Sequence, residues 1–367
     1  MSRGRAMLRI CHVTPTYFSP ESVLGGGERF AEELACAMAE RVEVKLVSFG
    51  RRAVRERPKP RFERVVLRSR TRDRMTPFSW GLFRELREAD VIHCHQYFTL
   101  PTFLAALSGR LRKRPVFVSD LGGGGWTPGY QIDQSRWIAA HLPVSEYAAR
   151  SLPGRHRRHQ VIWGGVDLAR YPKRAELAHD GSAVFLGRVL PHKGVHFLIE
   201  GLPPGVPLHV IGPEPDVAYA ARLRELARGT PEKDVRFHGA LPDAEVIARL
   251  GQAMALVHPT PVDAAGSAGV NELFGLAVVE AMARGCPVVA SDAASLPEIV
   301  EPERSGLLVP PNDPAAIGRA LARLRDDPPF WRALAAGARQ RVEERFTWEY
   351  VVSRCLEAYG EDWRGGR

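Results

Sequence analysis

Two cations in a short loop are the first residues of this sequence with an evident chemistry. Arg188 and Lys193 stand five positions apart in GRVLPHKG, which comes directly off the apolar run AVFLGRV. Two cations in a loop between a strand and a helix can converge on one anion, and a diphosphate fits such a pair. The alternative is a turn with two solvent-exposed cations, and this loop taken alone favours that alternative.

A second segment, VNELFGLAVVEAMARG, would supply backbone donors for the same anion. A helix is predicted to begin near Phe274 and Gly275, so the amides of Phe274, Gly275 and Leu276 would lack intrahelical acceptors. Unpaired amides at a helix start form an anion site. Together with Arg188 and Lys193 they would hold a nucleoside diphosphate and stabilise it as a leaving group without a metal.

The same segment carries two glutamates, and Glu280 lies within its apolar run LAVVEAMA. An ionised carboxylate in such surroundings is destabilising unless hydroxyls or amides satisfy it, and the two hydroxyls of a ribose would do so. We therefore expect Glu280 to bind a ribose and Glu272, just ahead of the helix, to face the transferred group. The alternative is that Glu280 marks the polar face of an amphipathic helix.

Glycines of the first half could bring backbone close to a ligand. Gly25, Gly26 and Gly27 are predicted to lie in a loop between the first strand and its helix. Glycines there let amides approach a phosphate or a sugar closely, and a flexible loop is the alternative.

Histidines and a second glycine-rich loop supply further candidates. His93 and His95 fall on one face of the predicted strand in VIHCHQ, because strand side chains alternate. His95 is a candidate general acid/base or acceptor-orienting group, and two packed, hydrogen-bonded histidines are an equal alternative. Zinc would need a third ligand, which we do not locate in the sequence. Asp120, Trp126 and Tyr130, in SDLGGGGWTPGYQ, could line a carbohydrate acceptor pocket.

The elements that would position these residues alternate along the chain. Segments of strand composition alternate with segments of helical periodicity, which predicts parallel sheets covered by helices. A polar connector over residues 164–182 interrupts the alternation, and we place a domain boundary there. Two such domains facing each other would form a cleft at the carboxyl ends of their strands. The predicted strands span 8–15, 42–49, 89–96, 114–120, 183–189, 207–212, 234–240, 254–260 and 286–292, and the final helices span 313–327 and 329–361.

Composition limits the classes of protein that remain. The chain has 367 residues, room for two domains, and a net charge of +9. Five scattered cysteines indicate neither disulfides nor a zinc site, and the lack of a signal peptide or long apolar run favours a cytoplasmic protein. The basic stretch 51–74 is either a solvated loop and strand edge or a surface that attracts anionic lipid headgroups or a phosphorylated acceptor. Nucleic acid is not indicated, because no groove-reading motif accompanies the charge.

Taken together, these residues resemble the retaining glycosyltransferases of family 4, also called glycosyl transferases group 1. The resemblance covers nearly the whole chain and is most specific in NELFGLAVVEAMARGCPVVASD. It implies an α/β protein of the GT-B fold, with two doubly wound Rossmann-like domains facing across a cleft. An N-terminal acceptor-binding domain would span 1–172, a C-terminal donor-binding domain 180–345, and a C-terminal helix over 346–367 would cross back to the first domain.

The resemblance also implies an activity and roles for residues. The activity is retaining transfer of a hexose from a nucleoside diphosphate sugar, UDP- or GDP-sugar first, to a glycan, lipid-linked or small-molecule acceptor, with no metal or other cofactor. By the same analogy the diphosphate is bound by two cations, the base lies near residues 236–238, and Gly26 and Gly27 meet the donor–acceptor junction. The catalytic group would comprise Glu272, Arg188, Lys193 and His95.

Three departures from the family pattern accompany this resemblance. Gly164, in VIWGGVD, stands where asparagine is common. Asp120 and Leu121 stand where family members often carry a histidine close to the reacting sugar. The segment TPVDAAGSAGVNE, which leads up to Glu272, is longer than usual and is a candidate lid over the donor sugar.

Competing functions remain at this point. A noncatalytic sugar-nucleotide-binding regulatory subunit would bind nucleotide without turnover, and a nicotinamide-dependent dehydrogenase is disfavoured because G-x-G-x-x-G is absent. For an active enzyme we expect a role in cell-envelope polysaccharide biosynthesis, with possible peripheral contact with an anionic membrane at its inner face. The base, the sugar, the acceptor and the oligomeric state are not indicated by the sequence.

Overall fold

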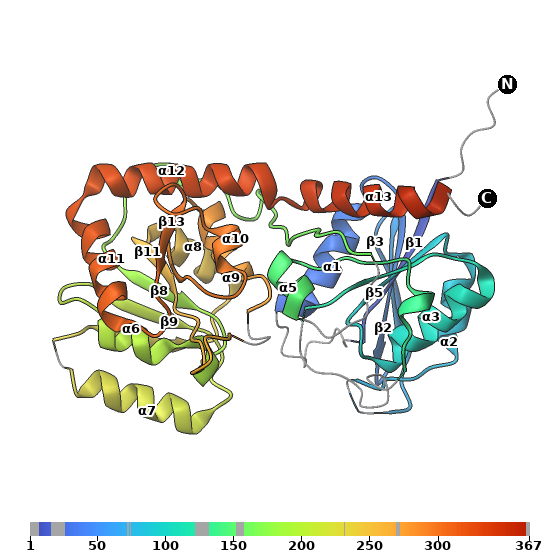
Figure 1. The fold of residues 1–367 in the computed structure, drawn as a ribbon, viewed down its shortest axis with the longest axis horizontal. Helices are drawn as coiled ribbons and strands as arrows, with labels where there is room; N and C mark the ends of the chain where they lie inside the picture. The colour runs from blue at the N-terminus through green and yellow to red at the C-terminus, as the bar shows by residue number, and fades with distance from the viewer. Residues whose placement is uncertain are drawn as a thin grey trace. The chain divides into compact units, whose positions relative to one another are not determined.

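The structure is a computed structural model, and it describes residues 7–15, 26–71, 73, 75–121, 132–151, 158–230, 232–268 and 272–364. Side chains are described for these residues except 26–28 and 361–364. The chain divides into two compact units (Figure 1). Unit 1 comprises Met1–Gly165 and Trp348–Arg367, and unit 2 comprises Val166–Thr347. The first change of unit falls within the connector over residues 164–182.

Unit 1 is built on a seven-stranded sheet in the order β3-β4-β2-β1-β5-β6-β7. All neighbouring strands pair in parallel except β3, which is antiparallel to β4. The strand order reverses at β1, which has β2 on one side and β5 on the other, so the carboxyl ends of β1 and β5 form the switch point at which open α/β sheets bind ligands. The strands are β1 (Arg9–Val13), β2 (Glu43–Gly50), β3 (Val54–Lys59), β4 (Phe62–Arg68), β5 (Val91–His95), β6 (Val116–Ser119) and β7 (Ala140–His141).

Helices cover both faces of this sheet. On one face α1 packs against α13, the helix that returns to unit 1 after unit 2 (Figure 1). On the other face α2 and α3 share an apolar core with the odd-numbered positions of β1 and the even-numbered positions of β5. The helices are α1 (Gly26–Met38), α2 (Gly81–Glu85), α3 (Leu100–Arg112), α5 (Glu146–Ser151) and α13 (Trp348–Arg364), with short 3₁₀ helices η1 (Leu86–Glu88) and η2 (Ser135–Trp137).

Unit 2 is built on a six-stranded, all-parallel sheet in the order β10-β9-β8-β11-β12-β13. Its central strands are short and wholly buried, as in ALVH and VVAS, which is typical of parallel strands covered on both faces. The order reverses between β8 and β11, so the loops after these two strands share the switch point of this unit. The strands are β8 (Ala183–Leu186), β9 (Leu208–Ile211), β10 (Val235–Gly239), β11 (Ala255–His258), β12 (Val288–Ser291) and β13 (Gly306–Val309).

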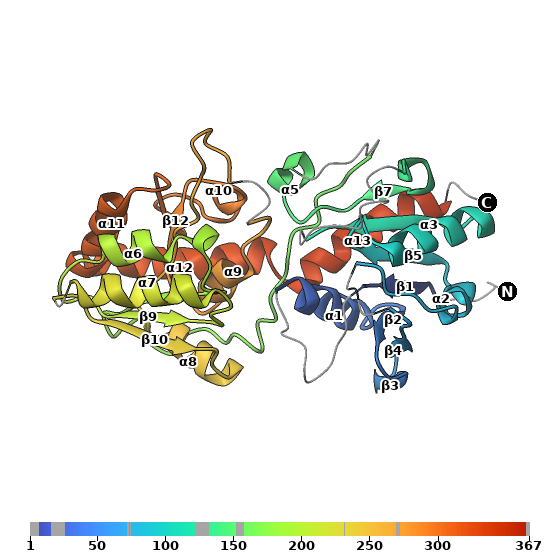
Figure 2. The ribbon, with the colours of Figure 1, turned by 90° about the horizontal axis from the view of Figure 1, so that it is seen from below.

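Three helices of unit 2, α7, α11 and α12, begin at an aspartate that caps the first turn. Asp216, Asp313 and Asp327 each accept a hydrogen bond from the amide three residues later, which satisfies a first-turn donor. Figure 2 shows α6 and α7 side by side, and α9 packs against β11 and β12. The helices are α6 (Val195–Gly201), α7 (Val217–Arg228), α8 (Asp243–Gln252), α9 (Leu276–Ala283), α10 (Leu296–Ile299), α11 (Pro314–Asp326) and α12 (Pro328–Arg345), with η3 (Pro191–Lys193).

The predicted α/β alternation is therefore confirmed. The basic stretch contains the antiparallel pair β3–β4, and β3 is an exposed edge strand, which agrees with the strand edge expected as one alternative. Two local expectations are corrected. Gly26 and Gly27 form the start of α1 and do not lie in the loop ahead of it. The tail over 329–361 is two helices, because the chain leaves helical geometry at Phe346. None of the helices in the described part of the chain is both long and apolar enough to cross a membrane.

Candidate functional site

Glycines allow the loop after β8 to pack tightly against its neighbours. A Cβ on Gly212 would lie 1.9 Å from the carbonyl oxygen of Gly187, and a Cβ on Gly194 would lie 1.9 Å from that of Pro259. Gly194 also has a φ of 69°, which glycine adopts without strain. The loop after β8 therefore lies directly against the segment that follows β11, and this contact fixes where Lys193 points.

Replacing Gly194 by Ala is expected to lower the free energy of unfolding by about 2–4 kcal/mol, from backbone strain and collision together. Gly205→Ala is the matched control, because Gly205 has a φ of 78° but nothing within 4 Å of an added Cβ. The control should lose only about 1–2 kcal/mol, the cost of the left-handed conformation. Urea unfolding of both variants tests this, and equal losses would show that the close approach to Pro259 carries no energy.

Lys193 and Glu272 meet at the centre of this contact. Lys193 Nζ donates to Glu272 Oε2 at 2.6 Å, and His258 Nε2 lies 2.6 Å from the same oxygen. Glu272 is 8% exposed and His258 3% exposed. Ser295 Oγ donates to the Glu272 carbonyl at 3.0 Å, which holds the backbone of the glutamate in place. The carboxylate, the ammonium and the imidazole thus form one compact cluster at the switch point of unit 2.

The charge of Glu272 is set by this cluster. Burial by itself would raise the pKa of the carboxyl group, but the Lys193 ammonium and then His258 oppose that effect. Together they hold the pKa of Glu272 well below its usual range. Because its pKa is lowered in this way, Glu272 is ionised at neutral pH. An ionised carboxylate can stabilise positive charge nearby.

The start of α9 has the geometry that the sequence predicted for an anion site. Gly275 caps the helix in the left-handed conformation, with a φ of 89°, and no side chain caps it. Within the described residues, the amides of Phe274, Gly275 and Leu276 donate to no acceptor. Glu280 is 6% exposed, so the carboxylate is buried as expected. Its contact with a ribose stays a prediction.

Arg188 is placed differently from Lys193. Its side chain is exposed and forms no ion pair with a described residue, whereas Lys193 is paired with Glu272. Burial lowers the pKa of His192, and Lys193 and Arg188 lower it further, so both cations act on the same short loop. Their convergence on a diphosphate stays a prediction.

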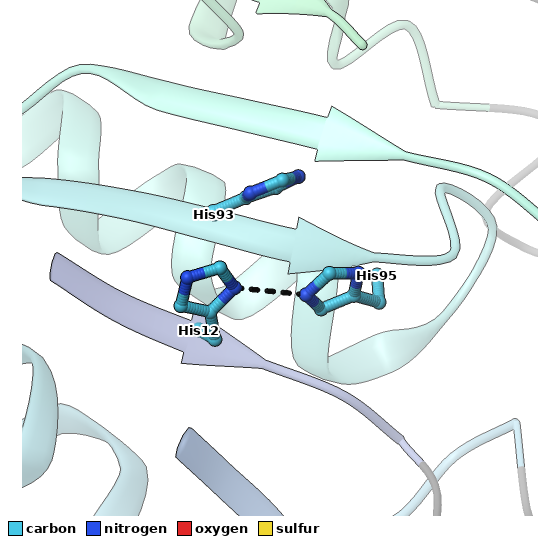
Figure 3. Close-up of side chains that lie close together, drawn as sticks. All are labelled: His12, His93 and His95. Atoms are coloured by element: carbon cyan, nitrogen blue, oxygen red, sulfur yellow. Dashed lines mark hydrogen bonds between the residues drawn. The ribbon is translucent and has the colours of Figure 1, made fainter. Parts of the chain in front are cut away.

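Three histidines of unit 1 form a buried cluster, shown in Figure 3. His12 in β1 is in register with His93 in β5, and His12 Nδ1 lies 3.0 Å from His95 Nε2. His93 Nε2 lies 2.7 Å from Ser119 Oγ, and His93 Nδ1 lies 2.7 Å from the Tyr359 hydroxyl of α13. All three rings are at most 1% exposed. These contacts favour the alternative of packed, hydrogen-bonded histidines over a role for His95 at an acceptor.

Burial also keeps these histidines neutral. It lowers the pKa of His95 to about 3. Burial lowers the pKa values of His12 and His93 as well, and the neighbouring imidazoles lower them further. His12 supplies the third histidine that a metal site would need, with candidate ligand atoms within 4.8 Å of one another. Both nitrogens of His93 are nevertheless hydrogen-bonded already, so the arrangement fits side-chain packing better than a cation.

The remaining predicted residues are Asp120, Trp126 and Tyr130 of the acceptor pocket and the residues of β10 expected near the base. Asp120 is 5% exposed and accepts a hydrogen bond from the Tyr97 amide at 3.0 Å, so it braces the loop after β5. Trp126 and Tyr130 lie outside the described residues. In β10, Arg236 pairs with Asp234, and His238 Nε2 lies 2.8 Å from His209 Nδ1. A nucleotide base near β10 stays a prediction.

The candidate lid is partly described. Val262 is held by Asn312, which accepts a hydrogen bond from its amide at 3.2 Å and donates to its carbonyl at 2.8 Å. Residues 269–271, the last part of the segment, lie outside the described residues. A lid function for 260–272 stays a prediction.

Sequence reasoning missed His258 and His12. Each ends or nearly ends an apolar strand, where a single histidine resembles a packed core residue. Their position at the ends of strands could have indicated them. Both strands flank a switch point, where residues at the carboxyl ends of strands lie at the ligand-binding edge.

Comparisons with known proteins match the sequence of this chain to two family models. Residues 24–170 match the family described as Glycosyltransferase Family 4, and residues 172–341 match Glycosyl transferases group 1. Glycogen synthase of Mycobacterium tuberculosis is 33% identical over 218 residues, which cover 56% of this chain and 49% of the relative. Phosphatidyl-myo-inositol mannosyltransferase of Mycobacterium leprae is 36% identical over 200 residues, covering 52% and 48%. The chain spans about half the length of these curated relatives.

Solved structures of low sequence identity share the fold. Anabaena HepE in complex with UDP and glucose superimposes with a TM-score of 0.75 at 18% identity, covering 96% of this chain and all of that one. Sucrose-phosphate synthase from Thermosynechococcus elongatus gives a TM-score of 0.74 at 20% identity, covering 98% and 100%. The two α/β units therefore have the fold of these solved structures.

Proposed function

Because the chain belongs to the family 4 glycosyltransferases and has their GT-B fold, we propose that it transfers a hexose, with retention, from UDP- or GDP-sugar to a glycan, lipid-linked or small-molecule acceptor. The observation that carries the proposal is the Lys193–Glu272–His258 cluster next to the uncapped start of α9. A cation and a row of amides suit a diphosphate, and a carboxylate suits the sugar that departs from it.

In this mechanism the leaving diphosphate takes its stabilisation from the chain itself. The amides of Phe274, Gly275 and Leu276 would bind its oxygens, and Arg188 and Lys193 would balance the charge that grows as the glycosidic bond breaks. Glu272 would then face the donor sugar and balance positive charge on its ring. Because these groups supply the positive charge, the proposed reaction needs no metal.

The names of the relatives support a proposal for the acceptor class. Several of them are named for glycosyl transfer to inositol phosphate or phosphatidylinositol, or to an O-antigen chain. We therefore propose an acceptor of the cell envelope, reached from the cytoplasm, with peripheral contact with an anionic membrane. Flotation with anionic liposomes at low salt tests the membrane contact, which is refuted if the protein stays in the dense fraction.

Ligand-induced stabilisation tests the donor site. UDP or GDP at 100 times its Kd should contribute about 2.7 kcal/mol to the free energy of unfolding. We expect one nucleoside diphosphate among UDP, GDP, ADP and TDP to raise the unfolding temperature, equally with magnesium and with EDTA. Lys193→Ala should abolish the rise, and Arg112→Ala, an exposed arginine of unit 1, should keep it. No rise with any of the four would refute the donor site.

A further inference from the structure

A small hollow in unit 1 lies between the end of β4 and the start of α2. It is lined by Arg68, Ser69, Arg70, Ser79, Trp80 and Gly81, and we call it the Trp80 hollow. Trp80 is 68% exposed, although tryptophan is normally among the more buried residues. A large aromatic face left open in a hollow is a feature of ligand sites.

The indole of Trp80 is held in a fixed orientation. Phe78 meets it edge to face, with ring centroids 5.1 Å apart, and Phe83 lies 6.0 Å away on α2. Ser69 Oγ accepts hydrogen bonds from the amides of Thr71 and Phe78, each at 3.2 Å, and ties the two ends of the loop together. The aromatic face is therefore preformed, which reduces the ordering cost of binding.

The hollow carries two cations that pair with no described carboxylate, whereas the cations nearest to it in strands β3 and β4 are neutralised by carboxylates. Arg55, Lys59 and Arg64 are all paired with glutamates. Arg68 and Arg70 are exposed, and neither side chain has an ion pair or hydrogen bond to a described residue. Two unpaired guanidinium groups on one hollow attract an anion that can accept from both.

One carboxylate of the same loop is already engaged. Asp73 Oδ1 accepts from the Met75 amide at 2.9 Å, and Oδ2 accepts from the Thr76 hydroxyl at 2.8 Å. These two bonds, the amide first, lower the pKa of Asp73. The carboxylate is therefore an internal brace of the loop and does not line the hollow.

The hollow lies at the ligand-binding edge of the unit 1 sheet. Its loop follows the carboxyl end of β4, and the Ser69 amide donates to Gly50 at the end of β2 at 2.8 Å. The Leu100 amide, at the start of α3, donates to Met75 of the same loop at 3.0 Å. The hollow therefore shares an edge with the loop after β5, where parallel α/β sheets bind ligands.

We propose that the Trp80 hollow binds a negatively charged sugar residue of the acceptor. The flat face of Trp80 would stack on the sugar ring, Arg68 and Arg70 would bind its carboxylate or phosphate, and Ser79 lies within the lining to meet a hydroxyl. This inference rests on the proposed function, because it assigns the acceptor class of that reaction. A sugar fits better than a membrane surface, since the other side chains that line the hollow are arginines and serines.

Direct binding tests the proposal without turnover. Pentagalacturonate and mannose 6-phosphate serve as anionic probes and maltopentaose as the neutral probe, with the full chain in a calorimeter at low salt. We expect at least one anionic probe to bind, and maltopentaose to bind at least tenfold more weakly. Trp80→Ala and the double variant Arg68→Ala/Arg70→Ala should each weaken the anionic probe at least tenfold. Arg112→Ala, an exposed arginine outside the hollow, should leave it unchanged.

Several outcomes would overturn the proposal. It is wrong if neither anionic probe binds, or if the Trp80 and arginine variants bind as the unaltered chain does. It is also wrong if these variants lose binding to phosphatidylglycerol vesicles while keeping the anionic sugars, since the hollow would then be a membrane contact. Stabilisation by nucleoside diphosphate, measured on the same variants, should persist. If nucleoside diphosphates stabilise neither the variants nor the unaltered chain, the proposed function is refuted, whatever the sugar-binding result for the Trp80 hollow.

Discussion

Glycosyl transfer by the Glu272→Gln variant is expected to fall by about 10²–10⁴-fold, roughly 3–5 kcal/mol in the activation barrier. Glu272 Oε2 contacts both Lys193 and His258 at 2.6 Å. Glutamine keeps the size of the side chain and an acceptor oxygen but removes the charge, so the donor sugar and the two partners lose a negative charge. The measurement is release of nucleoside diphosphate from the sugar donor whose diphosphate stabilises the protein.

Three further variants separate catalysis from stability. Glu303→Gln removes a carboxylate from the exposed ion pair with Arg323 in the same unit, and its rate should stay unchanged. Lys193→Ala should also react slowly. The rate loss of the double variant with Glu272→Gln should be smaller than the product of the two single losses, because each substitution disrupts the same ion pair. If Glu272→Gln and Lys193→Ala both react at the unaltered rate while folded, the assignment of this cluster is wrong.

Acidification below pH 6.5 is expected to destabilise unit 1 steeply. Burial lowers the pKa values of His12, His93 and His95 in the folded chain, and that of His95 reaches about 3. The unfolded chain therefore binds these protons first as the pH falls, so the stability they contribute is full above pH 6.5 and is lost below it. Each histidine contributes a slope of at most about 1.4 kcal/mol per pH unit, and three contribute about 4.

Hydrogen exchange at the amides of β1 and β5 measures this slope, because it reports opening of unit 1 separately from unit 2. The His95→Asn variant removes one titrating ring and retains a side chain that can donate to His12. Its slope between pH 6 and pH 5 should be smaller by about 1.4 kcal/mol per pH unit. Identical slopes in the variant and the unaltered chain would show that His95 does not titrate on unfolding.

The sequence predicted the central architecture well because buried parallel strands are short apolar runs. AVFL, LHVI, ALVH and VVAS are all such runs, and all are strands. The exposed strand β3, with the sequence VRERPK, has no apolar alternation, and only its pairing with β4 makes it a strand. The break between α12 and α13 is not visible in helical periodicity, since both sides of Phe346 have helical composition, and only the family resemblance, with its separate helix over 346–367, indicated it.

The sequence predicted individual residues of the candidate site but not the contacts between them. Residue types and a helix start pointed to Lys193, Glu272 and the amides before α9, each from a local pattern. The ion pair of Lys193 with Glu272 spans 79 positions and depends on two glycines that let separate loops touch. His12 and His95 are 83 positions apart and meet only because β1 and β5 are neighbours in the sheet. Contacts of this kind follow from topology, which one-dimensional periodicity does not encode.

The return of α13 to unit 1 has a consequence for the order of events during synthesis. Tyr359 and His93 are hydrogen-bonded across 266 positions of chain. At about 5–20 residues per second the ribosome needs roughly 10–50 s between the two. Unit 2 is continuous and can fold as it emerges, whereas the sheet of unit 1 waits through that interval with the α13 side of its histidine cluster uncovered. Of the two units, unit 1 therefore begins first along the chain and is completed second.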